Sequence, residues 1–160
     1  MYACFFLKLR ILPLTYRIRC EKMDFIGEKL RNMKDVTAAI ILKDNKVLIA
    51  QRAPEERLAG KWEFPGGKME PGETPQQCLS REINEELEVT VEVLDFFGES
   101  IYRYEHGEIR LLAYFCRWIE GNFILNVHSR LEWVGRDELG GFDFAPADIP
   151  LAKKLETFLQ

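Results

Sequence analysis

The stretch that most constrains the fold is residues 66–89, GGKMEPGETPQQCLSREINEELEV, in which a double glycine precedes a helical pattern. Thr74 is a suitable N-cap, Pro75 suits the first helical position, and Gln77 completes a T-x-x-Q capping box. Three aliphatic residues then recur with helical spacing and fall on one flank of a helical wheel: Leu79, Ile83 and Leu87. The stretch therefore predicts a glycine turn that leads into an amphipathic helix packed on the core.

A second stripe of the same helix is acidic, because Glu82, Glu85 and Glu86 recur at spacings of three and four. Like charges at these spacings destabilise a helix by roughly a few tenths of a kcal/mol per pair. The penalty grows if the carboxylates converge in a partly buried site, and a divalent cation would remove it. Oxygen ligands of this kind select Mg²⁺ or Mn²⁺ over zinc. The stripe indicates a metal site, with a solvated acidic surface as the alternative.

Apolar runs predict strands on both sides of this helix. The expected strands cover residues 36–42, 46–51 and 62–64, a hairpin formed by 96–104 and 109–118, and a short strand at 131–134. A closing amphipathic helix is expected at residues 148–159. The pattern therefore predicts one α/β (α+β) domain over residues 33–160.

Residues 1–32 differ from the rest of the chain, because they are rich in Lys and Arg and charges interrupt their apolar residues. They hold no apolar run long enough for a transmembrane helix, and no small-residue cleavage site follows their apolar pieces. An amphipathic arm on a membrane surface is disfavoured by irregular apolar spacing. We interpret residues 1–32 as an N-terminal extension, either disordered or the product of a mis-assigned start, with Met23 and Met33 as other starts.

Charge and cysteine content narrow the class of protein further. The net charge of −4 argues against a nucleic acid polymer as partner, although a single nucleotide can still be held locally. The apolar spacing of residues 1–32 argues against a membrane as partner. None of the 4 cysteines has the spacing of a metal knuckle or a C-x-x-C motif. We therefore expect free thiols in a reducing environment and a cytoplasmic location.

The motif G-x5-E-x7-R-E-U-x-E-E-x-G-U, in which U is a bulky aliphatic residue, runs through the helical stretch. It is matched by Gly67, Glu73, Arg81, Glu82, Ile83, Glu85, Glu86 and Val89. The motif is the signature of the Nudix hydrolases, so the chain resembles that family. The segments AIILKDNKVLIAQR, GKWEFPGGK and FAPADIPLAKKL are similar to the MutT and CTP-pyrophosphohydrolase branch, and the resemblance covers most of residues 34–160.

The resemblance implies the Nudix fold, a mixed β-sheet sandwiched between α-helices, with the motif forming a loop–helix–loop. It also implies that water attacks the β-phosphorus of a nucleoside triphosphate, giving the monophosphate and pyrophosphate. Arg81 would orient the glutamates, and Glu73 would act either in the metal shell or as a structural brace. The metal ligands carried over from the family are the carbonyl of Gly66 and the side chains of Glu82, Glu85 and Glu86. The cofactor implied is Mg²⁺ or Mn²⁺.

Two positions depart from the family pattern. Glu88 stands where the motif has its last glycine, and a non-glycine residue in a left-handed conformation costs roughly 1–2 kcal/mol. MutT-like relatives usually carry a late glutamate six residues before the tryptophan of LEWV, a position held here by Val127. This leaves the general base open, with His128 as one substitute and three glutamates as others: Glu99, Glu105 and Glu108.

Four residues are candidates for contacting the nucleotide: Arg52, Phe64, Lys68 and Asp148. Phe64 would pack on the base or belong to the core, and Arg52 would reach the nucleotide or pair with a surface acid. Asp148 would read the base or cap the last helix. An ionised aspartate only accepts hydrogen bonds, which favours the amino group of cytosine, whereas a protonated one could read 8-oxoguanine.

These observations predict an Mg²⁺-dependent nucleoside triphosphate pyrophosphohydrolase, monomeric or homodimeric. Its expected task is to clear (d)CTP-type or 8-oxo-dGTP nucleotides from the nucleotide pool. Two alternatives remain open. One is a degenerate Nudix module that binds a nucleotide as a sensor, and the other is a hydrolase of a different nucleoside diphosphate derivative.

Overall fold

The computed structural model describes residues 33–105 and 107–158, so the expectation for residues 1–32 lies outside the described residues. The elements in chain order are β1 (Met33–Lys43), β2 (Lys46–Arg52), β3 (Trp62–Glu63), α2 (Pro75–Leu87), β4 (Val89–Tyr104), β5 (Gly107–Gly121), β6 (His128–Gly135), the 3₁₀ helix η2 (Arg136–Gly141) and α3 (Ile149–Phe158). These elements confirm the predicted α+β class.

Within the described residues the strands form a 6-stranded sheet in the order β3-β2-β1-β5-β4, and β6 pairs with β2. Strand β2 is antiparallel to β1, β3 and β6. In the β2–β6 pair, Arg52 lies opposite His128 beside a register shift between Gln51 and Arg52. This long-range pairing brings side chains that are distant in the sequence to one end of the sheet.

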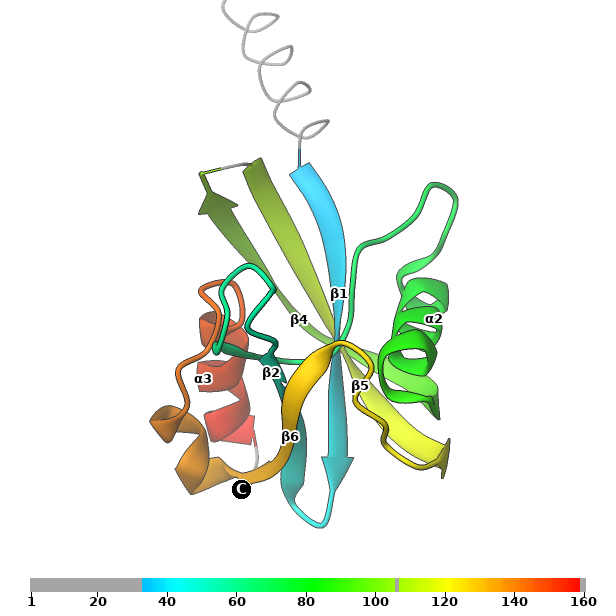
Figure 1. Ribbon diagram of the computed structural model, residues 1–160, viewed down its shortest axis with the longest axis vertical. Helices are drawn as coiled ribbons and strands as arrows, with labels where there is room; N and C mark the ends of the chain where they lie inside the picture. The colour runs from blue at the N-terminus through cyan, green and yellow to red at the C-terminus, as the bar shows by residue number, and fades with distance from the viewer. Residues whose placement is uncertain (1–32, 106, 159–160) are drawn as a thin grey trace, which may run out of the picture. The chain divides into compact units, whose positions relative to one another are not determined.

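The sheet lies between the two α-helices, with α2 on one face and α3 on the other (Figure 1). Because side chains of a strand alternate between faces, neighbouring residues of β1 enter different cores. Ile40 belongs to the cluster that includes Leu151 and Leu155 of α3. Ile41 belongs to the cluster formed with the aliphatic face of α2: Leu79, Ile83 and Leu87. The predicted apolar flank of α2 is therefore buried as expected.

The first turn of α2 has the predicted capping box. The Thr74 hydroxyl accepts from the Gln77 backbone N–H at 3.2 Å, and the Gln77 side chain accepts from the Thr74 N–H at 2.9 Å. Pro75 takes the first helical position. Two of the N–H groups that a helix start leaves open are thereby engaged, which fixes where α2 begins.

The C-terminal end of α2 is closed by Glu88 and by the loop between β5 and β6. Glu88 has φ 53 and ψ 32, the left-handed conformation expected at the last glycine of the motif. The Asn126 backbone N–H donates to the Glu86 carbonyl at 3.2 Å, and the Asn126 side chain donates to the Glu85 carbonyl at 2.9 Å. The loop thus satisfies carbonyls of the last turn, which offsets part of the cost of a non-glycine cap.

Other features of the fold extend the sequence-based expectations. Strand β4 begins at Val89, directly after the helix cap and well before the expected start at residue 96, and η2 is not anticipated by the sequence pattern.

Cys78 and Cys116 are buried free thiols. Within residues 33–105 and 107–158, neither α-helix is long and apolar enough to cross a membrane.

Candidate active site

The double glycine at residues 66–67 is pressed between β1 and α2. The Thr37 backbone N–H and hydroxyl both donate to the Gly67 carbonyl, at 2.8 and 3.2 Å. Gly66 has φ +151, and a Cβ there would lie 2.2 Å from the Thr37 carbonyl oxygen. A Cβ on Gly67 would lie 2.2 Å from the carboxyl carbon of Glu82. Glycine is required at position 66 because the backbone of β1 approaches it closely, whereas a side chain at position 67 would displace the carboxylate of Glu82.

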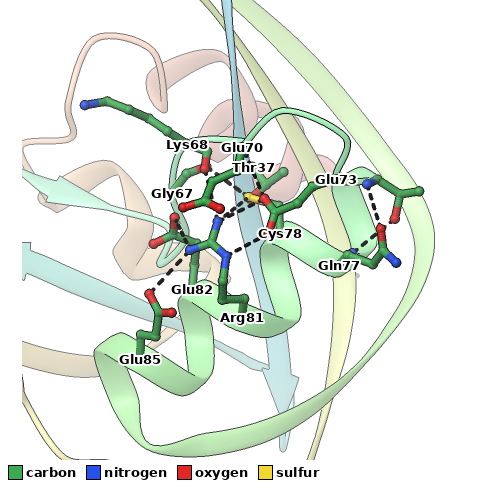
Figure 2. Close-up of polar contacts among 11 residues, drawn as sticks. Thr37, Gly67, Lys68, Glu70, Glu73, Gln77, Cys78, Arg81, Glu82 and Glu85 are labelled. Atoms are coloured by element: carbon green, nitrogen blue, oxygen red, sulfur yellow. Dashed lines mark hydrogen bonds and ion pairs between the residues drawn. The ribbon is translucent and has the colours of Figure 1, made fainter.

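Arg81 of α2 is the centre of an ion-pair network that ties the preceding loop to the helix (Figure 2). Its Nε and Nη2 donate to the two carboxylate oxygens of Glu73, at 2.7 and 3.0 Å. Its Nη1 donates to Glu82 at 2.9 Å and to Glu85 at 3.3 Å. The hydrogen bonds from Arg81 are the main cause that lowers the pKa of Glu73 to about 2. The guanidinium therefore holds three carboxylates in fixed positions.

Glu73 and Lys68 occupy the loop side of this network. The Glu73 Oε2 also accepts from the Glu70 N–H at 2.9 Å, so both Glu73 oxygens are engaged within the loop. These contacts agree with the structural brace rather than the metal shell. The Lys68 carbonyl accepts from Arg81 Nη2 at 3.3 Å, while its exposed side chain extends away from the network (Figure 2). Binding of substrate by Lys68 stays a prediction.

Glu86 differs from its neighbours on α2, because its Oε2 is buried and has no hydrogen-bond partner. Burial raises the pKa of the Glu86 carboxyl to about 7, and the charges of Glu63 and Glu82 act in the same direction. The His128 ring and the Gly66 backbone act in the opposite direction. A half-buried carboxylate with one unpartnered oxygen lacks part of its charge compensation, which a bound cation can supply.

The predicted metal ligands belong to α2 and the glycine turn, but they do not form a coordination site in this structure. Within residues 33–105 and 107–158, no three His, Cys, Asp or Glu side chains are grouped in a way that could hold a metal ion. Two of the predicted ligands, Glu82 and Glu85, form ion pairs with Arg81. Coordination by Gly66, Glu82, Glu85 and Glu86 therefore stays a prediction.

Glu63 is a site residue that the sequence pattern does not single out. Its Oε2 accepts from Arg52 Nη1 at 2.5 Å, and its Oε1 lies 3.1 Å from Nε2 of the buried His128. Glu63 thus joins β2, β3 and β6 at one point. The signal that could have revealed it is its place between Trp62 and Phe64, because a polar residue between two buried aromatics points to the other face of the strand.

Three of the predicted nucleotide-contacting residues come together at the end of β3. The Phe64 backbone N–H donates to Asp148 Oδ1 at 3.0 Å, and both residues are buried. Arg52 lies near enough to act electrostatically on the Asp148 carboxyl. Asp148 therefore ties the start of α3 to β3, which is more than the role of a helix cap.

The expectation of an ionised Asp148 is not supported. Burial is the main cause that raises the pKa of Asp148 well above its ordinary value, and Glu63 adds to it, while the Phe64 N–H and Arg52 oppose it. A neutral carboxyl donates a hydrogen bond from one oxygen while the other accepts from Phe64. The preference for a cytosine amino group therefore no longer follows from Asp148.

The position of the missing late carboxylate differs in burial from its neighbour His128. Val127 is 42% exposed, whereas His128 is buried beside Glu63. The three glutamates considered as substitutes lie on the β4–β5 hairpin: Glu99, Glu105 and Glu108. The side chain whose charge acts most on Glu86 is instead His128. Among the substitutes considered, His128 is therefore the one with an electrostatic effect on the acidic stripe.

Comparison with known proteins agrees with this geometry. The model of the NUDIX domain matches residues 33–156. The CTP pyrophosphohydrolase of Escherichia coli (strain K12) is 39% identical over 127 residues, which cover 79% of this chain and 92% of the relative. The 8-oxo-dGTP diphosphatase of the same strain is 32% identical over 127 residues, covering 79% of this chain and 98% of the relative.

A solved structure supports the same assignment. The solution structure of the E. coli ORF135 protein superposes with a TM-score of 0.70 at 36% identity, covering 79% of this chain and 91% of the other. The glycine turn, the Arg81 network and the acidic stripe of α2 together occupy the segment in which the family motif lies. The chain therefore belongs to the Nudix family and is a Nudix hydrolase.

Proposed function

We propose that this Nudix hydrolase converts nucleoside triphosphates into nucleoside monophosphates and pyrophosphate with the help of a divalent cation. The names of the two E. coli relatives support a nucleotide substrate. The observation that carries the proposal is Glu86, whose Oε2 is buried without a partner beside the Arg81 network. An acidic site repels a polyphosphate, so the two can meet only when a cation lies between them.

The residues present fit a hard divalent cation. Glu82 lies against the glycine turn and Glu86 carries the unpartnered oxygen, which supports these two carboxylates as ligands of the proposed cation. Glu85 is exposed and must release Arg81 before it can join them, and the Gly66 carbonyl would complete the set. When bound, Mg²⁺ neutralises phosphate charge and lowers the pKa of water.

The side chains of the chain then have separate tasks. Arg81 and Glu73 hold Glu82 in place, and Glu86 accepts the proton of the attacking water. The water oxygen forms a bond to the β-phosphorus, and the bond from that phosphorus to the oxygen shared with the α-phosphate breaks. The nucleoside monophosphate leaves with that oxygen, and the other product is pyrophosphate.

The base would bind beside Phe64, Asp148 and Arg52, which lie together at the end of β3. A neutral Asp148 offers an O–H donor, and both cytosine and 8-oxoguanine present acceptors to such a group. We therefore extend the proposal to (d)CTP-type and 8-oxo-dGTP nucleotides, whose removal would cleanse the nucleotide pool.

The proposal is tested by a panel of nucleoside triphosphates incubated with the protein and Mg²⁺, with pyrophosphate as the measured product. We expect pyrophosphate from at least one of CTP, dCTP and 8-oxo-dGTP, and none when a chelator replaces Mg²⁺. If nucleotides bind with Mg²⁺ but no pyrophosphate appears from any of them, the chain is a nucleotide sensor and the proposed hydrolysis is rejected.

The protonation of Asp148 is tested by Asp148→Asn. Asparagine keeps an acceptor for the Phe64 N–H and a donor for the base, so a neutral Asp148 predicts that kcat/KM changes by less than about fivefold on both CTP and 8-oxo-dGTP. An ionised Asp148 predicts a selective loss on CTP of roughly tenfold to a hundredfold. Asp148→Ala is the control, because it removes the bond to Phe64 and should lower the melting temperature.

A further inference from the structure

The glycine turn shares backbone hydrogen bonds with β1. The Ala39 N–H donates to the Pro65 carbonyl and the Thr37 N–H donates to the Gly67 carbonyl, each at 2.8 Å. Successive carbonyls of an extended chain that pairs with a strand point in opposite directions. Because the carbonyls of residues 65 and 67 face β1, the Gly66 carbonyl between them faces away from β1.

Two buried side chains hold the Gly67 carbonyl in addition to this backbone bond. The Thr37 hydroxyl donates to it at 3.2 Å, and the Cys78 thiol of α2 donates to it at 3.6 Å. The hydroxyl oxygen and the thiol sulfur also lie 3.3 Å apart, so either group can donate to the other. Each group has one hydrogen, so whichever of them donates to its neighbour, the other still donates to Gly67. The Thr37–Cys78 pair therefore ends on the glycine turn in either arrangement.

The Thr37 hydroxyl is not needed to form β1. The residues that follow it in the strand are buried and apolar, and valine, which lacks the hydroxyl, would suit such a position. The Thr37 N–H already pairs the turn with β1, and a buried hydroxyl is costly unless it is bonded. The Thr37–Cys78 pair thus adds to the strand a firmer hold on one carbonyl of the turn. The same turn lies against Glu82, whose carboxyl carbon would be 2.2 Å from a Cβ on Gly67.

We propose that Thr37 and Cys78 are positioning residues for the cation. By holding the Gly67 carbonyl towards β1, they keep the Gly66 carbonyl directed away from β1 and available to the cation that the acidic stripe binds. Neither side chain touches the cation or the substrate, and the inference rests on the proposed function. Because such couplings are reciprocal, a bound cation must in turn stabilise the contacts of the Thr37–Cys78 pair.

The inference is tested by titrating the full chain with Mn²⁺ in the absence of nucleotide, with free Mn²⁺ measured by electron paramagnetic resonance. Thr37→Val leaves the thiol on Gly67, and Cys78→Ala leaves the hydroxyl there. We expect each single substitution to raise the Kd for Mn²⁺ by about twofold or less and the double substitution to raise it by about tenfold or more. The conservative variant Thr37→Ser keeps the hydroxyl and should restore the Kd of wild type.

A merely structural pair predicts a different result. Its loss would lower the melting temperature of the double variant, while the folded protein would keep the Kd of wild type for Mn²⁺. That result would overturn the inference. Effects of the two single substitutions that simply multiply in the double variant, or a wild type that binds no Mn²⁺, would also overturn it.

A second measurement uses the wild-type protein and needs no substitution. Iodoacetamide reaches a buried thiol only when the chain opens, and mass spectrometry distinguishes Cys78 from Cys116, a second buried thiol that serves as the control. We expect Mn²⁺ to slow the alkylation of Cys78 by about tenfold and that of Cys116 much less. Equal slowing of both thiols, or no slowing of Cys78, would overturn the inference.

Failure of the proposed function has a separate signature. A wild type that binds Mn²⁺ but hydrolyses no nucleotide would reject the proposed hydrolysis. Both Mn²⁺ measurements would still support or overturn the role of the Thr37–Cys78 pair, because neither of them uses a nucleotide.

Discussion

The two sides of the acidic stripe on α2 are built in opposite ways. On the Arg81 side each carboxylate has a partner, and Glu73 has partners at both oxygens. On the Glu86 side a carboxylate oxygen and an imidazole nitrogen are buried without partners. Leaving buried polar atoms unsatisfied costs stability, so this side is maintained for what it binds. The first side therefore holds the loop and the helix together, and the second side is the one at which we propose that the ligands bind.

The sharpest test of this difference is Glu86→Gln, which should lower kcat by about 100-fold or more because a cation ligand and proton acceptor is lost. The circular dichroism spectrum should stay unchanged. Glu88→Gln is the matched control, since it removes the same charge two residues away while its Oε1 still accepts from Asn126. If both variants lose kcat equally, the effect belongs to the net charge of the helix end and not to Glu86.

The Glu86 side can also be tested by measuring how the free energy of unfolding of the cation-free protein depends on pH. The pKa of Glu86 is raised from 4.5 to about 7, so the folded state is penalised once the carboxyl ionises. The penalty is absent below about pH 4.5, grows as pH rises towards 7, and reaches up to about 3 kcal/mol above it. In urea unfolding with a chelator, Glu86→Gln should therefore exceed wild type in stability at pH 8 and equal it at pH 4.

Adding Mg²⁺ at pH 8 should narrow that gap by stabilising wild type more than the variant. A stability difference that stays constant from pH 4 to pH 8 would contradict the raised pKa of Glu86.

Gly67→Ala tests the contact between the Glu82 carboxylate and the glycine turn, which lies between the Arg81 side and the Glu86 side of the stripe. The added methyl would meet the Glu82 carboxyl carbon at 2.2 Å, so Glu82 must move away from the glycine turn. We expect kcat to fall roughly 10- to 100-fold, because small displacements of a positioned group are costly. Gly141→Ala serves as the control, since a Cβ there meets nothing within 4 Å. Equal activity of the two variants would show that Glu82 needs no fixed position.

The smallest expected effect concerns the Arg81 side. Arg81→Lys keeps the charge but loses the two-pronged bond to Glu73, and we expect the free energy of unfolding to fall. Arg130→Lys alters the exposed ion pair with Glu132 and should lower the free energy of unfolding by no more than roughly a few tenths of a kcal/mol, as is usual for surface pairs. Equal losses in urea unfolding would mean that the Arg81 network is an ordinary surface feature.

The predictable part of the site is the part encoded by local signals. The capping box at Thr74, the left-handed turn at Glu88 and the acidic stripe all depend on residues within one helix of each other, so their spacing predicts their geometry. The partners of Glu63 could not be assigned in this way, because Arg52 and His128 meet through the pairing of β2 with β6. Strand pairing over such a distance depends on the whole fold and not on nearby residues.

The protonation state of Asp148 could not be predicted from the sequence for a related reason. Its sequence neighbourhood shows a residue before a helix, and nothing there reveals that the carboxyl is buried against the Phe64 backbone. Burial is a property of the assembled domain, and it decides which protonation state is favoured.

The contact between the β5–β6 loop and the last turn of α2 has a consequence for how this domain can diverge. Surface loops usually accept added or deleted residues at little cost. Here Asn126 is bonded to the Glu85 and Glu86 carbonyls, and His128 follows only two positions later. An inserted residue in this loop would either break those bonds or shift the register of β6 against β2. The length of the loop is therefore constrained by the chemistry at its end, and variants of this domain should vary its sequence more readily than its length.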